Sequence, residues 1–283
     1  MKTAQKIVIA FIRFKLALYA AFSNKRAGAY ALKLFLTPAR NLPKKIPSIF
    51  KEAETLSLSL PPYQLVGYRW NHPQQKKVMI LHGFSSTIMK FDHFVKPLMR
   101  QGYEVVAIDA PAHGKSSGKQ LSVFDYKAMI QKAYETYGPI DAFIAHSFGG
   151  LALSLFLKEL PEHENIKAVL IAPATETSTA ITTFCRFLHI DEKIKREMEN
   201  MIYERSGFHD EDISISKAAA YIKAQVLWIH DEDDEVTPWR DAQKIEQAGY
   251  PNFQFILTHT LGHRKIYRDN KVKKAVFDFL NDH

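Results

Sequence analysis

Cysteine, long apolar runs and, near the start of the chain, acidic residues are scarce in this 283-residue sequence. Its single cysteine, Cys185, excludes an internal disulfide framework and a cysteine-rich zinc site. No run of about 18 apolar residues occurs, which argues against a clean transmembrane helix. Hydrophobic residues make up 46% and charged residues 24% of the chain, so an intrinsically disordered protein is excluded. The length is sufficient to bury a sizeable core without covalent cross-links.

Acidic residues are absent from residues 1–51, which contain 11 of the 38 lysines and arginines. Removing these 11 from 38 leaves 27 basic residues against 30 acidic ones, a net charge of −3 for the remainder. The whole chain carries +8, so its positive charge belongs to an N-terminal arm. The nearly neutral body offers no basic groove, and no nucleic-acid partner is expected.

The arm begins with an apolar, helix-compatible segment at residues 7–22, which Arg13 and Lys15 interrupt. These charges, and the lack of a clear cleavage site, argue against a signal peptide. Two interpretations stay open. The helix packs on the body or on a second copy in a homo-oligomer, or residues 1–35 bind an anionic membrane surface. We expect a cytoplasmic protein, which in the second case is membrane-associated.

The chain is predicted to have two parts. Five prolines between residues 38 and 62 favour a connector, so residues 1–62 are interpreted as arm and connector, and residues 63–283 as the main domain. In the main domain, short apolar runs alternate with amphipathic segments, which is typical of a mostly parallel, doubly wound α/β sheet. Strands are predicted at residues 64–70, 77–81, 104–108, 140–145, 166–172, 225–230 and 253–257. Helices are predicted at residues 91–100, 122–137, 149–160, 239–248 and 269–280.

One interval breaks this alternation. Residues 174–223 contain no convincing strand, and residues 182–188 and 191–205 have helical patterns. We interpret this insertion as a helical cap over the active edge of the sheet. Ligands of such folds bind beyond the carboxyl ends of the strands, so the reactive residues should follow the strands directly.

The strongest local signal is the sequence Ala145-His146-Ser147-Phe148-Gly149. A serine on a sharp turn between a strand and a helix is held above the sheet edge, where only small residues fit two positions before and after it. Gly149 supplies the second small position, and Ala145 the first, in place of the usual glycine. Ser147 is therefore a candidate nucleophile, and it needs a base because a serine hydroxyl is a weak nucleophile near neutral pH.

Acid and base candidates follow the last two predicted strands, in the chain order serine, acid, histidine. Residues 231–235 are all acidic; Asp231, Asp233 and Asp234 are the candidate acids, and Asp234 is favoured. The candidate bases are His263, which is favoured, and His259. The acidic run lacks the spacing of a calcium-binding loop. No nucleotide-binding glycine loop or metal cluster is evident, so no cofactor is expected.

On these residues, positions 64–283 resemble the α/β-hydrolase superfamily. The matching patterns are D-x-V-x-P at residues 234–238, Gly-His at residues 262–263 and the His-Gly turn at residues 82–83. Residues 109–118, D-A-P-A-H-G-K-S-S-G, look like a loop of one group of bacterial α/β hydrolases. The resemblance implies Ser147 as nucleophile, His263 as base and Asp234 as its orienting acid. It also implies an oxyanion hole built from the backbone N–H groups of Phe84 and Phe148.

The function implied is that of a serine hydrolase cleaving an ester or thioester of a small or acyl substrate. An acyltransferase or a perhydrolase could use the same triad. A module that mainly binds a membrane or a partner through the basic arm is the alternative from another class. A dehalogenase would be expected to carry aspartate at position 147 and is disfavoured. His82, His113 and Ser116 are expected to shape loops rather than react.

Overall fold

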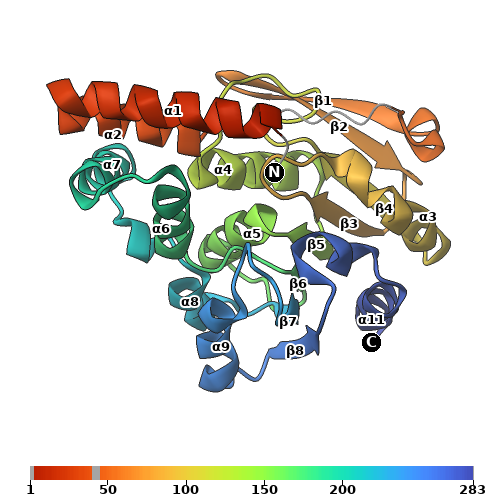
Figure 1. Cartoon of the computed structure of the whole chain (residues 1–283). Coiled ribbons are helices and arrows are strands. Elements are labelled where there is room, and N and C mark those ends of the chain that lie inside the picture. The colour runs from red at the N-terminus through yellow and green to blue at the C-terminus, as the bar shows by residue number, and fades with distance from the viewer. Residues whose placement is uncertain (1–2, 40–44, 283) are drawn as a thin grey trace. The chain divides into compact units, whose positions relative to one another are not determined.

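The computed structural model describes residues 3–39 and 45–282, and the chain divides into two compact units (Figure 1). Met1–Thr37 and Glu176–Ser214 form one unit, which is built of helices and is called here the helical unit. Pro38–Thr175 and Ile215–His283 form the other, the sheet unit. Two stretches far apart in the sequence therefore combine in the helical unit.

One eight-stranded sheet organises the sheet unit, in the order β1-β2-β4-β3-β5-β6-β7-β8. The β1–β2 and β2–β4 pairs are antiparallel, and all other neighbours are parallel. The mostly parallel α/β sheet predicted from the sequence is therefore confirmed. The strands are β1 (Glu54–Leu60), β2 (Tyr63–Trp70), β3 (Lys76–Leu81), β4 (Tyr103–Ile108), β5 (Ala142–His146), β6 (Lys167–Ile171), β7 (Gln225–Asp231) and β8 (Phe253–Thr258).

The central strands β4 and β5 are buried along their whole length because helices cover both faces of the sheet (Figure 1). On one face, Phe94 of α3 and Val276 of α11 join Val78, Val105 and Ile144 of the strands in one buried cluster. The helices of the sheet unit are α3 (Asp92–Arg100), α4 (Val123–Tyr137), α5 (Phe148–Glu159), α8 (Ile215–Ala218), α9 (Trp239–Ala248), α10 (Gly262–Lys265) and α11 (Asn270–Asn281). Short 3₁₀ turns are η1 (Ser48–Lys51), η2 (Ile88–Phe91), η4 (Ala219–Tyr221) and η5 (Ile266–Arg268).

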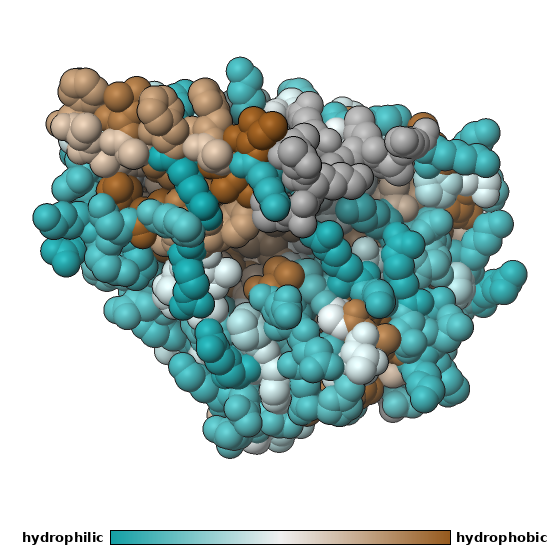
Figure 2. All heavy atoms as spheres, in the orientation of Figure 1, coloured by the Kyte–Doolittle hydropathy of each residue, from teal (hydrophilic) through white to brown (hydrophobic). Residues whose placement is uncertain are grey.

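The helical unit has its own apolar core. Leu16, Leu32, Ile181 and Met198 are buried there, each from a different helix, together with Cys185. A band of apolar side chains also runs along the outside of α1, as the brown and tan spheres of Figure 2 show. The helices are α1 (Thr3–Phe22), α2 (Asn24–Phe35), α6 (Thr177–Leu188) and α7 (Glu192–Ser206), with the 3₁₀ turn η3 (Asp210–Asp212).

Strand β1 is the main departure from the sequence-based expectation. Residues 38–62 were interpreted as a connector, yet they contain η1 and β1 and belong to the sheet unit. Along β1, Leu56 and Leu58 are buried while Ser57 and Ser59 are exposed, which is the alternation of an edge strand with one solvated face. The surrounding prolines obscured this pattern.

The helices predicted in the insertion agree with α6 and α7, although α6 already begins at Thr177. That this insertion caps the active edge of the sheet stays a prediction. Within residues 3–39 and 45–282, no helix combines the length and the apolar character needed to cross a membrane.

Candidate active site

Ser147 stands on a tight turn between β5 and α5. Its φ and ψ are +55° and −122°, a backbone conformation that residues other than glycine rarely adopt. The turn brings the first residues of α5 against β3, and a Cβ atom at Gly149 would lie 2.7 Å from the carbonyl oxygen of His82. Only glycine fits there, which explains the small residue required two positions after the serine.

His263 reaches this serine from the other end of the sheet unit's sequence. It lies in the short helix α10 that follows β8, and its Nε2 is 2.9 Å from Ser147 Oγ. The backbone carbonyl of His263 accepts a hydrogen bond from Nε2–H of His146, at 3.0 Å. His146, the residue next to Ser147, therefore helps to hold the backbone of His263, from which the imidazole faces the Ser147 hydroxyl.

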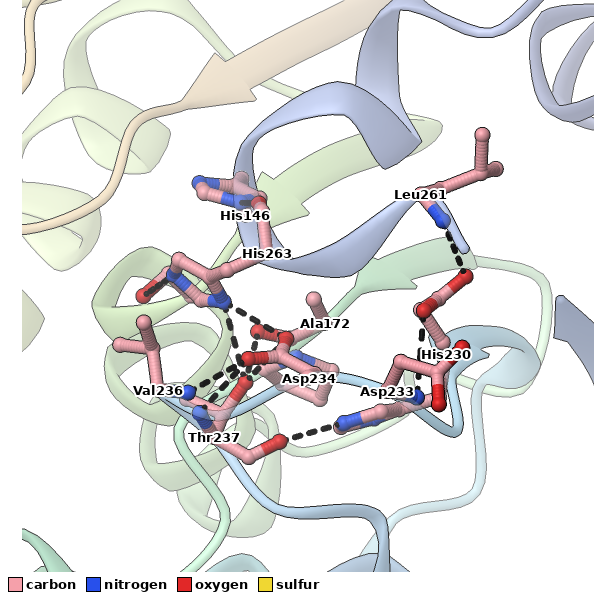
Figure 3. A network of polar contacts seen from close by, with 12 residues as sticks. His146, Ala172, His230, Asp233, Asp234, Val236, Thr237, Leu261 and His263 are labelled. Carbon is pink, nitrogen blue, oxygen red and sulfur yellow. Dashed lines mark hydrogen bonds and ion pairs between the residues drawn. The ribbon is translucent and has the colours of Figure 1, made fainter. Parts of the chain in front are cut away.

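Asp234 completes the arrangement from the loop after β7. Its Oδ2 lies 2.8 Å from Nδ1 of His263, and its Oδ1 accepts hydrogen bonds from the N–H groups of Val236 and Thr237 (Figure 3). Burial raises the pKa of this carboxyl, but the bonds from His263 and the two N–H groups outweigh burial and leave the pKa below its ordinary value. Asp234 is thus an ionised acceptor that fixes the proton of His263 on Nδ1 and leaves Nε2 as the acceptor for Ser147.

Thr237 is a member of this network that the sequence analysis missed. Its hydroxyl donates to Oδ2 of Asp234 at 2.9 Å and lies 3.1 Å from Nδ1 of His263 (Figure 3). Its carbonyl oxygen accepts from Nε2–H of His230 at 2.7 Å. The local signal was present, because an aspartate often accepts backbone N–H groups two and three residues later and so places that turn against its own carboxylate.

The other candidate acids have different partners. Oδ2 of Asp231 accepts hydrogen bonds from Thr258 and from the N–H of Leu261. Oδ2 of Asp233 accepts from the N–H of Thr260. Both carboxylates therefore brace the loop that carries His263. The alternative base, His259, is exposed and pairs with Glu232 at 3.1 Å.

The loop after β3 lies directly against the serine. A Cβ atom at Gly83 would sit 2.9 Å from Cβ of Ser147, so glycine is required for this close approach. The rings of Phe84 and Phe148 meet edge to face at 5.6 Å between centroids. Within residues 3–39 and 45–282, no hydrogen bond from the backbone N–H of Phe84 or Phe148 is found. The two groups predicted as oxyanion donors thus remain available beside Ser147.

His82 locks the base of that loop. Its Nδ1–H donates to the carbonyl of Gly83, its Nε2 accepts from the N–H of Ala110, and its own carbonyl accepts from the hydroxyl of Tyr126. Burial lowers the pKa of His82 to about 4, so the ring is neutral near neutral pH and can both donate and accept. His82 thus joins the loop after β3 to the loop after β4.

The D-A-P-A-H-G loop after β4 provides the opposite half of this brace. Nε2 of His113 accepts from the N–H of Ser85, and Oδ1 of Asp109 accepts from the N–H of Ile88. Ser116 Oγ donates to the carbonyl of Asp109 at 2.6 Å. Burial holds the pKa of Asp109 above its ordinary value even though this carboxyl accepts hydrogen bonds from the N–H groups of Ile88 and Lys115. Asp109, His113 and Ser116 therefore shape the loop rather than face Ser147.

His146, immediately before Ser147, is buried between His263 and Tyr267, with ring centroids 4.8 and 4.7 Å away. Burial is the larger cause, and the neighbouring His263 the second, that lowers the pKa of His146 to about 3. The ring is therefore neutral near neutral pH. Its Nδ1 has no hydrogen-bond partner among the described residues. His146 therefore contacts His263 both through its ring and through Nε2–H, which donates to the His263 carbonyl.

Residues that could hold a metal ion do not cluster: among residues 3–39 and 45–282, no group of three or more His, Cys, Asp or Glu has a suitable arrangement. Cys185, in the helical unit, is buried, and burial raises its thiol pKa to about 11. It is an inert apolar side chain rather than a reactive thiol.

A known sequence family and several known structures are similar to this chain. Residues 72–204 match the sequence profile of the serine aminopeptidase S33 family. The structure is similar to an esterase of Pyrococcus furiosus, with a TM-score of 0.64 and 22% identity over 87% of this chain and 97% of that one. It is also similar to a thioesterase domain of the curacin biosynthetic pathway, with a TM-score of 0.58 and 16% identity over 81% of this chain and 99% of that one.

Two curated sequences that are similar to this chain are also described as serine hydrolases. The chain is 28% identical over 133 residues to a probable serine hydrolase of Drosophila melanogaster, and 23% identical over 201 residues to a serine hydrolase-like protein of Danio rerio. These matches cover 44% and 69% of this chain, and span 40% and 60% of the two relatives. The chain therefore has the α/β-hydrolase fold, and over the matched residues its sequence is similar to those of serine hydrolases.

Proposed function

We propose that this α/β hydrolase cleaves a carboxylic ester or thioester through a covalent acyl-enzyme, with Ser147 as nucleophile, His263 as base and Asp234 as acid. The observation that carries the proposal is the unbroken chain of contacts, 2.9 Å from Ser147 Oγ to His263 Nε2 and 2.8 Å from His263 Nδ1 to Asp234 Oδ2. The three residues come from three loops at the carboxyl end of the sheet, as a nucleophile, a base and an orienting group require.

The first half of the reaction follows from these contacts. Nε2 of His263 takes the hydroxyl proton while Ser147 Oγ attacks the carbonyl carbon of the substrate. The negative charge that develops on the carbonyl oxygen is stabilised by the N–H groups of Phe84 and Phe148. The imidazolium is stabilised by Asp234, whose carboxylate is ionised for the reason given above. The tetrahedral species then collapses, the alcohol or thiol leaves with the proton from His263, and the acyl group stays on Ser147.

The second half repeats the same steps with water. His263, neutral again, accepts a proton from a water molecule that attacks the acyl-enzyme. Collapse of the second tetrahedral species returns the proton to Ser147 Oγ and releases the carboxylic acid. An acyltransferase or perhydrolase would differ only in the molecule that replaces water.

The experiment is labelling of the full chain with a fluorophosphonate, read by intact mass, alongside hydrolysis of p-nitrophenyl esters and acyl thioesters of matched chain length. We expect one adduct, no adduct in Ser147→Ala, and a loss of hydrolysis of roughly 10⁴–10⁶-fold in that variant. Ser154→Ala is the matched control, because that buried hydroxyl bonds only within α5, to the carbonyl of Gly150. Failure of the native protein to label, or labelling that persists in Ser147→Ala, would overturn the proposal.

A further inference from the structure

Helix α1 has two apolar faces, and the core of the helical unit buries only one of them. Leu16 is buried in the core of the helical unit, and Ile9, Ile12 and Tyr19 pack against the same core. The other face carries six large apolar side chains, each between 47% and 73% exposed: Ile7, Val8, Phe11, Phe14, Leu18 and Phe22. These six residues are called here the apolar stripe, and Figure 2 shows a brown and tan band of apolar side chains along α1.

The apolar stripe is continuous rather than scattered. Positions 7, 11, 14, 18 and 22 are spaced by three or four residues, so their side chains project from one face of a helix. The intervening Ala10, Ala17 and Ala21 are also exposed and add no polar group. At 1.5 Å per residue the stripe is roughly 22 Å long. Exposed apolar surface on this scale usually marks an interaction site.

The charged side chains of α1 and α2, the two helices of the N-terminal hairpin, are all positive. Exposed cations lie at Lys6 on α1 and at Lys25 and Arg26 on α2. No acidic residue occurs in residues 1–51, and the acids of the helical unit lie on the second segment, 176–214. Arg13 and Lys15 are occupied within the unit: Arg13 donates to the carbonyl of Phe187, and Lys15 lies over the Tyr30 ring at 5.0 Å. The apolar stripe is thus accompanied by cations whose charge nothing on α1 or α2 balances.

We propose that α1 lies flat in the surface of an anionic phospholipid membrane, with the apolar stripe at the level of the upper acyl chains and the cations at the headgroup phosphates. An interfacial helix combines an apolar face with flanking lysine and arginine, as here. A second copy is the poorer occupant, because two such hairpins would face each other with like charges. This docking goes beyond the hydrolase chemistry and requires none of the residues proposed for it.

Sedimentation of the full chain with vesicles tests the proposal. One set is phosphatidylcholine alone, and the other is phosphatidylcholine mixed with phosphatidylglycerol. We expect strong binding to the anionic vesicles, weakened by added salt, and little binding to the neutral ones. The triple variant Phe11→Gln, Phe14→Gln, Phe22→Gln should bind at least about 10²-fold more weakly. The charge variant Lys6→Gln, Lys25→Gln, Arg26→Gln should lose at least about tenfold.

The matched control removes three exposed aromatic residues from the other segment of the same unit: Phe187→Gln, Tyr203→Gln and Phe208→Gln, which should bind as the wild type does. Ser147→Ala should also bind unchanged, which separates this proposal from the hydrolase function. Three results would overturn it: no binding to anionic vesicles, equal binding to neutral vesicles, or equal loss in the control and stripe variants. A dimer in light scattering that the stripe variant dissociates would identify a second copy as the occupant and overturn it as well.

Discussion

The edge of the sheet around Ser147 and the outer face of α1 differ in whether their side chains find contact partners within this chain. At the sheet edge, the carboxylates of Asp109, Asp231 and Asp234 are all buried, and each has partners in this chain. On α1, large apolar side chains lie in solvent although the opposite face of the same helix is packed. The first region is complete and preorganised, as a reaction site requires. For the second, we propose a counterpart outside the chain, the surface of an anionic membrane.

Among the predictions that compare these two regions, the largest expected effect distinguishes two buried carboxylates of the sheet edge that look alike in sequence. In Asp234→Asn the amide no longer fixes the His263 proton on Nδ1, and kcat for ester hydrolysis should fall roughly 10⁴-fold. Asp231→Asn weakens the hydrogen bonds that Asp231 accepts from Thr258, Leu261 and the N–H of Asp233, so it should lower the melting temperature and change kcat by less than about tenfold. Equal losses of kcat in the two variants would mean that the acidic run acts as a whole and not through Asp234.

A second prediction concerns the histidines that the sheet edge holds neutral. Burial lowers the pKa of His82 to about 4 and of His146 to about 3, against about 6.5 in the unfolded chain. The unfolded chain therefore binds more protons below pH 6.5, and the stability present above that pH is lost as the pH falls towards the folded-state pKa values.

The size of this loss can be measured by urea unfolding between pH 7.5 and 4.5. Each of the two histidines should contribute a slope of up to about 1.4 kcal/mol per pH unit below pH 6.5. His146→Gln should remove about one such slope. An unaltered slope in His146→Gln would show that this ring does titrate in the folded protein.

The sheet unit was largely predictable from the sequence because buried parallel strands leave continuous apolar runs. The runs at residues 104–108 and 140–145 correspond to β4 and β5, and the reactive residues could be sought directly after such runs. The chain order of serine, acid and histidine then selected Ser147 and His263, which the structure brings into contact. The roles of these residues in catalysis stay a prediction.

What the sequence did not predict depends on neighbours that are distant along the chain. The contact of Thr237 with Asp234 and His263, and the bond from His146 to the His263 carbonyl, exist only because three loops meet at one edge. Likewise, no pattern in residues 1–37 indicates that they share a core with residues 176–214. Apolar periodicity on α1 marks both faces equally, so only the structure distinguishes the buried face from the exposed one.

That distinction leads to the smallest expected effect. Leu16→Ala removes a side chain that is 4% exposed and should destabilise the helical unit by about 2–3 kcal/mol, because the cavity cannot fully close. Phe11→Ala, at 62% exposure on the same helix, should cost less than about 0.5 kcal/mol although it removes a larger side chain. Hydrogen exchange of the α2 amides measures both, since opening of the helical unit limits their exchange. Destabilisation of similar size in the two variants would mean that the chain itself covers the outer face of α1, and that its apolar stripe is part of a core rather than a surface that docks.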